Sequence, residues 1–328
     1  MVSIKDIASD LGVTAATVSN ALNGKGRVSE ALAQRIRARA DALGYRPSSA
    51  AVALKSGRSK VLGLVMPDLT NPLFPHIAQA LSIEADRLGY ATLIADSRGN
   101  AKEQEQAILR LVSRGVDGLL ILPQRGTTVP PTAVPRAIIN TSSDPANTSS
   151  ADHFGGGVLI ADHILALGHT HILLVGADPV SGVQQQRIAG MKSVLPPEVQ
   201  YDVLWGDEGF AATPDWVRDG VSAILCTSDL VAINVHSHLS RAGLTVPDDA
   251  SLTGFDDMSF SRVMHPPLTT VSQDMETLAL YILDAITKQI MGEKSPHEGQ
   301  TVPMDLVLRQ STKAPKNHIS PSNKEQIA

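Results

Sequence analysis

An alternation of apolar runs with helix-forming stretches beyond residue 60 constrains the fold of this chain more than any other feature. Short continuous apolar runs are typical of buried parallel strands, and they recur at 61–65, 91–95, 118–122, 136–139, 172–176, 223–226 and 251–255. Between them lie helix-forming stretches at about 75–89, 102–113, 154–167, 187–195 and 230–242. This alternation predicts an α/β body of two lobes, each built on a parallel sheet covered by helices.

Polar residues follow several of the predicted strands. The segment 68–74 follows the first strand, Ser228 and Asp229 follow a later one, and Asp256 and Asp257 follow the last. Ligands of open parallel sheets bind outside the carboxyl ends of the strands, so we expect a ligand cleft between the lobes. The alternative for Asp229 is a helix cap, and for Asp257 a structural turn residue.

The charge of the chain is divided unevenly along its 328 residues. The first 60 residues carry ten Lys or Arg and four Asp or Glu, whereas the remainder carries 18 basic and 29 acidic residues. A small basic segment on a large acidic body favours a nucleic-acid-binding module joined to another domain. On charge alone, a solvated charged surface is an equally good interpretation.

Three short helices are predicted in the first 46 residues. Ser3, Thr14 and Ser29 are candidate N-caps, and Gly12 and Gly44 are candidate helix ends. Helix, short turn with glycine, helix is the helix-turn-helix pattern. A small helical bundle without a role in DNA binding is the alternative.

The second of these helices, at 15–22, has small or polar side chains on its outer face. Asn20 can read the edge of an adenine, and Ala15 or Ala16 can contact a thymine methyl group. Serine and threonine hydroxyls, lysines and arginines can hold phosphates and set the register on DNA.

Four short motifs stand in this segment, at residues 4–8 (Ile-Lys-Asp-Ile-Ala), 12–14 (Gly-Val-Thr), 17–23 (Thr-Val-Ser-Asn-Ala-Leu-Asn) and 44–47 (Gly-Tyr-Arg-Pro). Through these motifs, and without a gap over about 58 residues, the segment closely resembles the head of the LacI/GalR family of bacterial transcription regulators. The resemblance implies that the residues matching Ala15, Ala16 and Asn20 face bases. The full predicted DNA-binding set is Thr14, Ala15, Ala16, Thr17, Ser19, Asn20, Asn23 and Leu54.

The linker at 47–60 carries a mechanism of its own. Pro47 ends the third helix, and 48–55 has helix-forming residues but spans only about two turns, so that it is marginal as an isolated helix. We expect it to be helical when packed against a symmetry mate on DNA. Leu54 has the position of the family's wedge leucine, which implies insertion into the minor groove at a central base step. A plain flexible tether is the alternative.

The body also resembles the regulatory core of this family, which is similar to periplasmic sugar-binding proteins. The matching stretches are 68–74, 116–119, 167–169, 187–190, 246–249, 254–257 and 267–271. By position the resemblance implies effector contacts from Asn71, Phe74, Asp152, Arg187, Ser228, Asp256 and Gln273. Such carboxylates, amides and guanidinium groups suit the hydroxyls of a small polar ligand, and Phe74 offers an apolar ring face.

One departure from the family pattern concerns an aromatic residue. The family usually has an aromatic residue after Gly-Asp, whereas this chain has Glu208 after Gly206 and Asp207, with Phe210 two residues further on. Glu208 and Phe210 are therefore both candidates to line the cleft.

Several classes of protein are disfavoured. The chain has none of the phosphate-loop, nucleophile-elbow or zinc-protease motifs, so we expect no enzyme, and it offers no residue pattern for a cofactor. His236 and His238 cannot share a helix face and Cys226 is the one cysteine, so we expect no metal site. Because no stretch approaches ~20 apolar residues and the start does not resemble a signal peptide, we expect a cytoplasmic protein without a membrane segment.

The expected domains are a helix-turn-helix head at 1–46, the hinge helix and linker at 47–60, and a core at 61–310 for effector binding and dimerisation. Within the core we expect an N-lobe at about 61–160 and 274–305 and a C-lobe at about 161–273. The tail at 311–328 has two prolines and no leucine heptads, so we expect disorder and no tetramer-forming coil.

The sequence therefore predicts a ligand-responsive transcription regulator, most simply a repressor. A homodimer would bind double-stranded, pseudo-palindromic operator DNA, and a small polar effector, a carbohydrate or its derivative, would control that binding from the cleft. Induction and corepression stay open. The alternative functions are a small-molecule-binding protein that does not bind DNA and an enzyme on an α/β scaffold.

Overall fold

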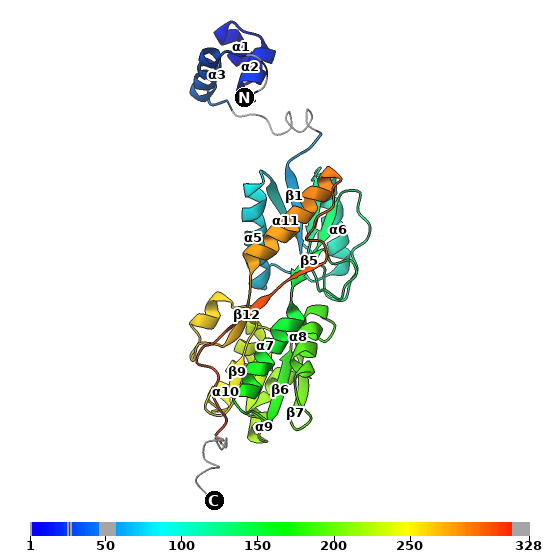
Figure 1. The fold of residues 1–328 in the computed structure, drawn as a ribbon, viewed down its shortest axis with the longest axis vertical. Helices are drawn as coiled ribbons and strands as arrows, with labels where there is room; N and C mark the ends of the chain where they lie inside the picture. The colour runs from blue at the N-terminus through cyan, green and yellow to red at the C-terminus, as the bar shows by residue number, and fades with distance from the viewer. Residues whose placement is uncertain (1, 25, 27, 46–56, 317–328) are drawn as a thin grey trace, which may run out of the picture. The chain divides into compact units, whose positions relative to one another are not determined.

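The computed structural model describes residues 2–24, 26, 28–45 and 57–316, and its chain divides into two compact units, 1–59 and 60–328 (Figure 1). The predicted hinge helix lies outside the described residues, as do Pro47 and Leu54.

The head is a bundle of three helices, α1 (Ile4–Leu11), α2 (Ala15–Leu22) and α3 (Glu30–Ala42). Local signals set their limits as predicted. The Ser3 hydroxyl accepts the Asp6 amide, and the Asp6 carboxylate accepts the Ser3 amide, which completes a capping box. Gly12, with φ of 64°, ends α1 in the left-handed conformation. The buried core contains Ile7, Ala8, Val18, Ala21, Ala33, Ile36 and Ala40.

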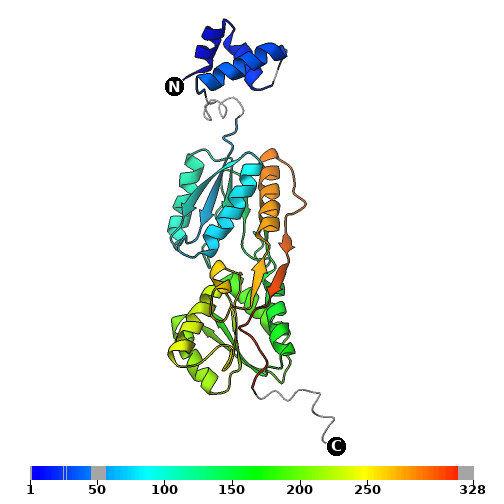
Figure 2. The ribbon, with the colours of Figure 1, turned by 90° about the vertical axis from the view of Figure 1, so that its left-hand side faces the viewer.

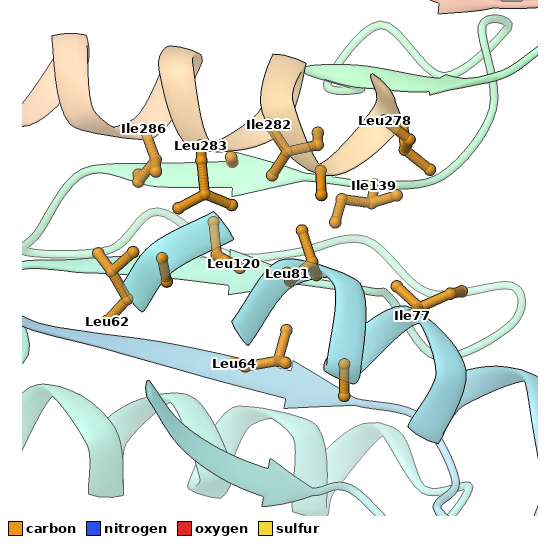
Figure 3. Close-up of a cluster of buried hydrophobic side chains, with 14 of the residues drawn as sticks. Leu62, Leu64, Ile77, Leu81, Leu120, Ile139, Leu278, Ile282, Leu283 and Ile286 are labelled. Atoms are coloured by element: carbon orange, nitrogen blue, oxygen red, sulfur yellow. The ribbon is translucent and has the colours of Figure 1, made fainter. Parts of the chain in front are cut away.

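The N-lobe of the body is a parallel sheet with strand order β2-β1-β3-β4. Its strands are β1 (Val61–Met66), β2 (Ala91–Asp96), β3 (Gly118–Ile121) and β4 (Arg136–Ile138). Helices α5 (Leu73–Arg87) and α6 (Ala101–Ser113) connect the strands, and α11 (Met275–Met291) returns from the C-terminal part of the chain to pack beside α5 (Figure 2). Figure 3 shows α11 contributing Leu278, Ile282, Leu283 and Ile286 to the same buried cluster as the sheet and α5.

The C-lobe repeats this architecture with strand order β7-β6-β8-β9. Its strands are β6 (His171–Gly176), β7 (Gln200–Trp205), β8 (Ala223–Cys226) and β9 (Ser251–Thr253). Its helices are α7 (His153–Ala166), α8 (Gly182–Ser193), α9 (Gly206–Arg218) and α10 (Asp229–Arg241). The two lobes together give the α/β fold that the sequence predicts.

Two small sheets lie where the chain passes between the lobes. Strand β5 (Ser149–Ala151) pairs with β11 (Gln300–Val302), and β10 (Thr270–Gln273) pairs with β12 (Met304–Val307). In both views these strands run between the two lobes. The chain therefore crosses between the lobes at three places, which restricts how one lobe can move against the other.

Glycines let α7 and α8 approach closely. A Cβ added to Gly157 would lie 2.2 Å from the carbonyl oxygen of Arg187, and one added to Gly190 would lie 2.0 Å from that of Phe154. Gly157 and Gly190 thus allow the backbones of the two helices to approach closely.

The lobe limits differ from the predicted ones. Helix α7 packs with α8 against the C-lobe core, so the first crossing lies before His153 and not near residue 160. The tail was expected to be disordered from residue 311, but Ser311 is buried and its hydroxyl donates to the Leu252 carbonyl at 2.6 Å. Residues 311–316 are therefore part of the C-lobe.

Sequence patterns also missed several elements. No prediction covered β7, α9 or α11, and α8 begins five residues earlier than expected, at Gly182 and not at Arg187. Among the described residues, no helix is long and apolar enough to cross a membrane.

We predict that Gly157→Ala lowers the free energy of unfolding by about 1–3 kcal/mol, because its Cβ would meet backbone atoms that cannot rotate away. Urea denaturation followed by circular dichroism measures the change. Gly182→Ala is the matched control, since its nearest neighbour would lie 3.9 Å away. Equal stabilities of the two variants would contradict the proposed close packing.

Candidate functional site

Polar side chains fix both ends of α2 in the head. The Thr14 hydroxyl accepts the Thr17 amide at 3.1 Å, so Thr14 is the N-cap. At the other end, the Asn23 side-chain amide donates to the Ser19 carbonyl at 2.6 Å. Four of the predicted DNA-binding residues therefore already serve to hold the helix in shape.

The two faces of α2 differ in burial. Val18 and Ala21 are buried against α1 and α3, whereas Ala16 and Asn20, one turn apart, are exposed, and Ala15 is partly exposed. The exposed face is thus the one on which the sequence places the base-facing residues, and its short side chains allow a close approach to a groove.

The body contains a cleft of about 430 Å³ between its two lobes. Segments 67–77, 122–128 and 139–145 of the N-lobe line one side, and residues 180–187, 227–228 and 256 line the other. The lining combines apolar side chains, such as those of Leu73, Ile77 and Leu278, with uncharged polar ones. The hydroxyl and amide side chains are those of Asn71, Gln124, Thr127, Thr128, Asn140, Thr141, Ser143, Ser150, Ser181, Gln184, Thr227, Ser228 and Gln273.

Six of the seven predicted effector residues line this cleft: Asn71, Phe74, Arg187, Ser228, Asp256 and Gln273. Asp152 is the exception, since it lies outside the lining and its carboxylate caps α7 by accepting the Gly155 amide at 2.8 Å. Its neighbour His153 lines the cleft instead. Nothing in the sequence distinguishes His153 from an ordinary helix residue.

A buried ion pair forms one wall of the cleft. Arg187 Nη2 lies 2.7 Å from Asp256 Oδ1, and only 3% and 4% of the two side chains are exposed. Arg187 Nη1 donates to the Thr227 carbonyl at 2.7 Å, and the guanidinium lies 3.9 Å from the centre of the Phe255 ring. The positive charge is thus surrounded by a carboxylate, a carbonyl and an aromatic face.

His153 is the third acceptor for Arg187. Its Nδ1 lies 3.4 Å from Arg187 Nε and 3.3 Å from Nη2. Burial, together with the nearby Arg187 charge, holds the pKa of His153 well below its usual range. The ring is therefore neutral, with its proton on Nε2, because Nδ1 must be free to accept.

Asp256 occupies an unusual backbone conformation, with φ of 101°. A non-glycine residue in this region is strained, and such residues concentrate at functional sites. Its Oδ1 accepts a second hydrogen bond, from Gln273 Nε2 at 2.6 Å. Gln273 lies on β10, one of the strands that cross between the lobes, so the ion pair is connected directly to the crossing segment.

Asp229 lies outside the cleft lining, and the alternative interpretation of Asp229 as a helix cap is also wrong, because its carboxylate binds groups of other segments. It is fully buried in the first turn of α10 and accepts hydrogen bonds from the Met258 amide (2.7 Å) and the Ser261 and Thr270 hydroxyls. Ser228 is the N-cap of α10. Asp257 likewise serves a turn, pairing with Arg262 at 3.0 Å.

Neither candidate for the missing aromatic residue lines the cleft. Phe210 is buried in the C-lobe core, and Glu208 lies in the exposed first turn of α9. Trp205, which precedes the Gly-Asp-Glu sequence, packs against Gly176. Among the described residues, Phe74 is the one Phe, Tyr or Trp of the cleft lining.

A helix-turn-helix head on a two-lobed body with a polar cleft defines a class: DNA-binding regulators that carry their own ligand-binding domain. Comparison with known proteins agrees. The family model described as bacterial regulatory proteins, lacI family, matches residues 3–48, and that of the periplasmic binding protein-like domain matches 161–312.

The curated relatives are transcriptional regulators, and the match extends over nearly their whole length. The transcriptional regulator MalR of Streptomyces coelicolor is 30% identical, covering 94% of this chain and 96% of its own. The transcriptional repressor PurR of Actinobacillus pleuropneumoniae is 28% identical, with 95% and 99% covered. A lac repressor dimer solved with operator and the anti-inducer ONPF has a TM-score of 0.82 at 27% identity, with 95% and 99% covered.

The chain therefore belongs to the LacI family of bacterial transcriptional regulators. This confirms the resemblance, the fold class and the prediction of a DNA-binding regulator. Because the relatives are transcription regulators, the enzyme alternative is set aside. In the described part of the chain, no three His, Cys, Asp or Glu side chains are grouped so that they could hold a metal ion.

Asp229 gives a pH prediction. Burial raises its pKa to about 6, above the 3.8 of the unfolded chain, so the native state binds more protons between these values. The contribution of Asp229 to stability is therefore present below pH 4 and falls by up to about 3 kcal/mol as the pH rises through about 6. Urea denaturation from pH 4 to 7 should show this fall in the native protein and a flatter profile in Asp229→Asn. Parallel profiles would contradict the prediction.

Proposed function

We propose that this protein is a repressor that binds a pseudo-palindromic operator as a homodimer and is controlled by a small polar effector, a sugar or sugar derivative, in the inter-lobe cleft. The observation that carries the proposal is that one chain holds both an exposed helix-turn-helix face and a polar cleft with a buried ion pair in its wall. We place its action in the cytoplasm, where bacterial DNA lies.

For the DNA contacts, we propose that α2 enters the major groove. Asn20 reads an adenine, and Ala15 and Ala16 contact thymine methyl groups, while Thr14, Thr17, Ser19 and Asn23 contact the backbone. Leu54, outside the described residues, is proposed as the minor-groove wedge on the basis of the family resemblance.

We propose that the two subunits of the homodimer contact each other through the side of the N-lobe formed by α5, β2 and α11. Strand β2 is an edge strand, and large apolar side chains of these three elements are exposed: Ile83, Leu93, Ile94 and Leu280. Exposed apolar patches commonly mark an association surface, and an uncovered edge strand is a liability that association removes.

For control, we propose that the effector contacts both lobes and changes the angle between them. Asn71 and Phe74 lie on the N-lobe side of the cleft, and Arg187 and Ser228 on the C-lobe side. A ligand that binds one lobe arrangement better shifts the population toward it by that difference in affinity. The sign of the shift decides between induction and corepression.

Selection of DNA from a random-sequence library by the purified protein tests the first half of the proposal. We expect enrichment of a site with two-fold symmetry. Enrichment of a single asymmetric half-site, or of no sequence, would contradict it. Adding ligands to the selected duplex and protein then tests control by the cleft.

We predict that Asn20→Ala weakens binding to the selected operator about 5–150-fold, the equivalent of about 1–3 kcal/mol for a lost bidentate base contact. Fluorescence anisotropy with a labelled duplex measures the affinity. The control is Gln34→Ala, an exposed amide on α3. Equal affinities of the two variants would remove Asn20 from the recognition surface.

We predict that Arg187→Ala abolishes the response of operator binding to the effector while operator affinity itself stays near that of the native protein. Removing Arg187 leaves the buried Asp256 carboxylate in the wall of the cleft without its counter-charge. Truncating one partner of such a pair costs about 2–5 kcal/mol, so we expect the ligand affinity to fall about 30-fold or more. Maltose, cellobiose, glucose and inosine are suitable first ligands. Arg218→Ala, in an exposed ion pair of α9, is the control. A normal response of Arg187→Ala would place the effector elsewhere.

A further inference from the structure

The hydrogen bonds of Arg187 are almost fully used within the protein. A guanidinium group has five N–H donors, and here four hydrogen bonds lead to three acceptors: the Thr227 carbonyl, Asp256 Oδ1 and His153 Nδ1. The Phe255 ring covers the guanidinium. Arg187 is therefore held as a fixed part of the wall and is not free to turn toward an incoming ligand.

The charges that line the cleft cancel. Among the described residues the charged lining side chains are two arginines, Arg125 and Arg187, and two aspartates, Asp144 and Asp256. Arg125 already faces a carboxylate outside the lining, Asp178, at 3.5 Å. His153 adds no charge, because its ring is neutral. The cleft thus has no excess positive charge with which to neutralise an anion.

We propose that the pairing of Arg187 with Asp256 makes the cleft selective for an uncharged, hydroxyl-rich ligand over its phosphorylated or carboxylated counterpart. This inference rests on the proposed function, in which the cleft is the effector site, and it specifies the class of the effector. A phosphate that took Arg187 as its partner would leave the buried carboxylate of Asp256 without its counter-charge, which is strongly unfavourable.

A neutral ligand avoids this cost. Both hydrogen bonds to Asp256 reach Oδ1, and the structure gives Oδ2 no donor among the described residues, so Oδ2 can accept from a ligand hydroxyl. The proton on His153 Nε2 can be donated to a ligand oxygen. The amides and hydroxyls of the remaining lining offer further neutral partners.

Equilibrium dialysis with radiolabelled inorganic phosphate and with glucose 6-phosphate, at constant ionic strength, tests the proposal. The variants are Asp256→Asn, which removes the carboxylate partner of Arg187, and Asp144→Asn. The second is a matched control, because it removes the same charge from the lining and leaves the Arg187–Asp256 pair intact. Circular dichroism checks that both variants are folded. Anion binding that the native protein and all variants share, such as binding to the basic head, is subtracted.

We expect the native protein and Asp144→Asn to bind neither anion in the cleft, and Asp256→Asn to bind both at least about 10-fold more tightly, the equivalent of about 1.4 kcal/mol. Saturable binding of either anion to the native protein that is lost in Arg187→Gln would overturn the proposal. So would a folded Asp256→Asn that gains no anion binding. Neither result bears on operator binding, which fluorescence anisotropy with the selected duplex measures separately. A failure of the proposed selectivity can therefore be distinguished from a failure of the proposed function.

Discussion

The buried pair of Arg187 and Asp256 is the interaction on which the functional part of this structure depends. Two opposite charges removed from water are tolerated only when each has close partners. The protein supplies them from several elements: a carbonyl at the end of β8, an imidazole from the start of α7, a ring beyond β9 and an amide from β10. The pair therefore fixes the positions of the loops that form one wall of the cleft.

The same pair connects the cleft to the segments that join the lobes. Gln273 donates to Asp256 from β10, and the antiparallel partner of Gln273 is Met304 on β12. A ligand that changes the hydrogen bonding of Asp256 would act on this crossing strand without an intermediate. Because the core of the N-lobe also contains α11, which follows β10 directly, a displacement of β10 would reach the face proposed for the dimer.

Local signals explain why much of the fold could be predicted from sequence. The caps at Ser3 and Thr14 and the terminator at Gly12 act within a few residues, and buried strands such as 61–65 are apolar throughout. Pairings between distant segments leave no such pattern. The tail at 311–316 looks polar and proline-rich, yet buried Ser311 binds residues about 40 and 60 positions away.

The residues of the cleft likewise divide into those that the sequence predicts and those that it does not. Residues placed by the family resemblance, such as Arg187 and Asp256, do line it, whereas His153 was missed because its role comes from its contact with Arg187 and not from its own sequence context. Asp152 was expected in the cleft, but an aspartate directly before a helix is also the best available cap, and here that role prevails.

The central claim is that binding of the operator and binding of the cleft ligand are thermodynamically coupled, because both depend on the same two arrangements of the lobes. The most direct test is to titrate the ligand against free protein and against protein saturated with the selected operator duplex. Linkage requires the operator to change the ligand dissociation constant by the same factor by which the ligand changes the operator dissociation constant. We predict equal factors, typically about 5–150-fold. A ligand dissociation constant that is the same with and without operator would contradict the account.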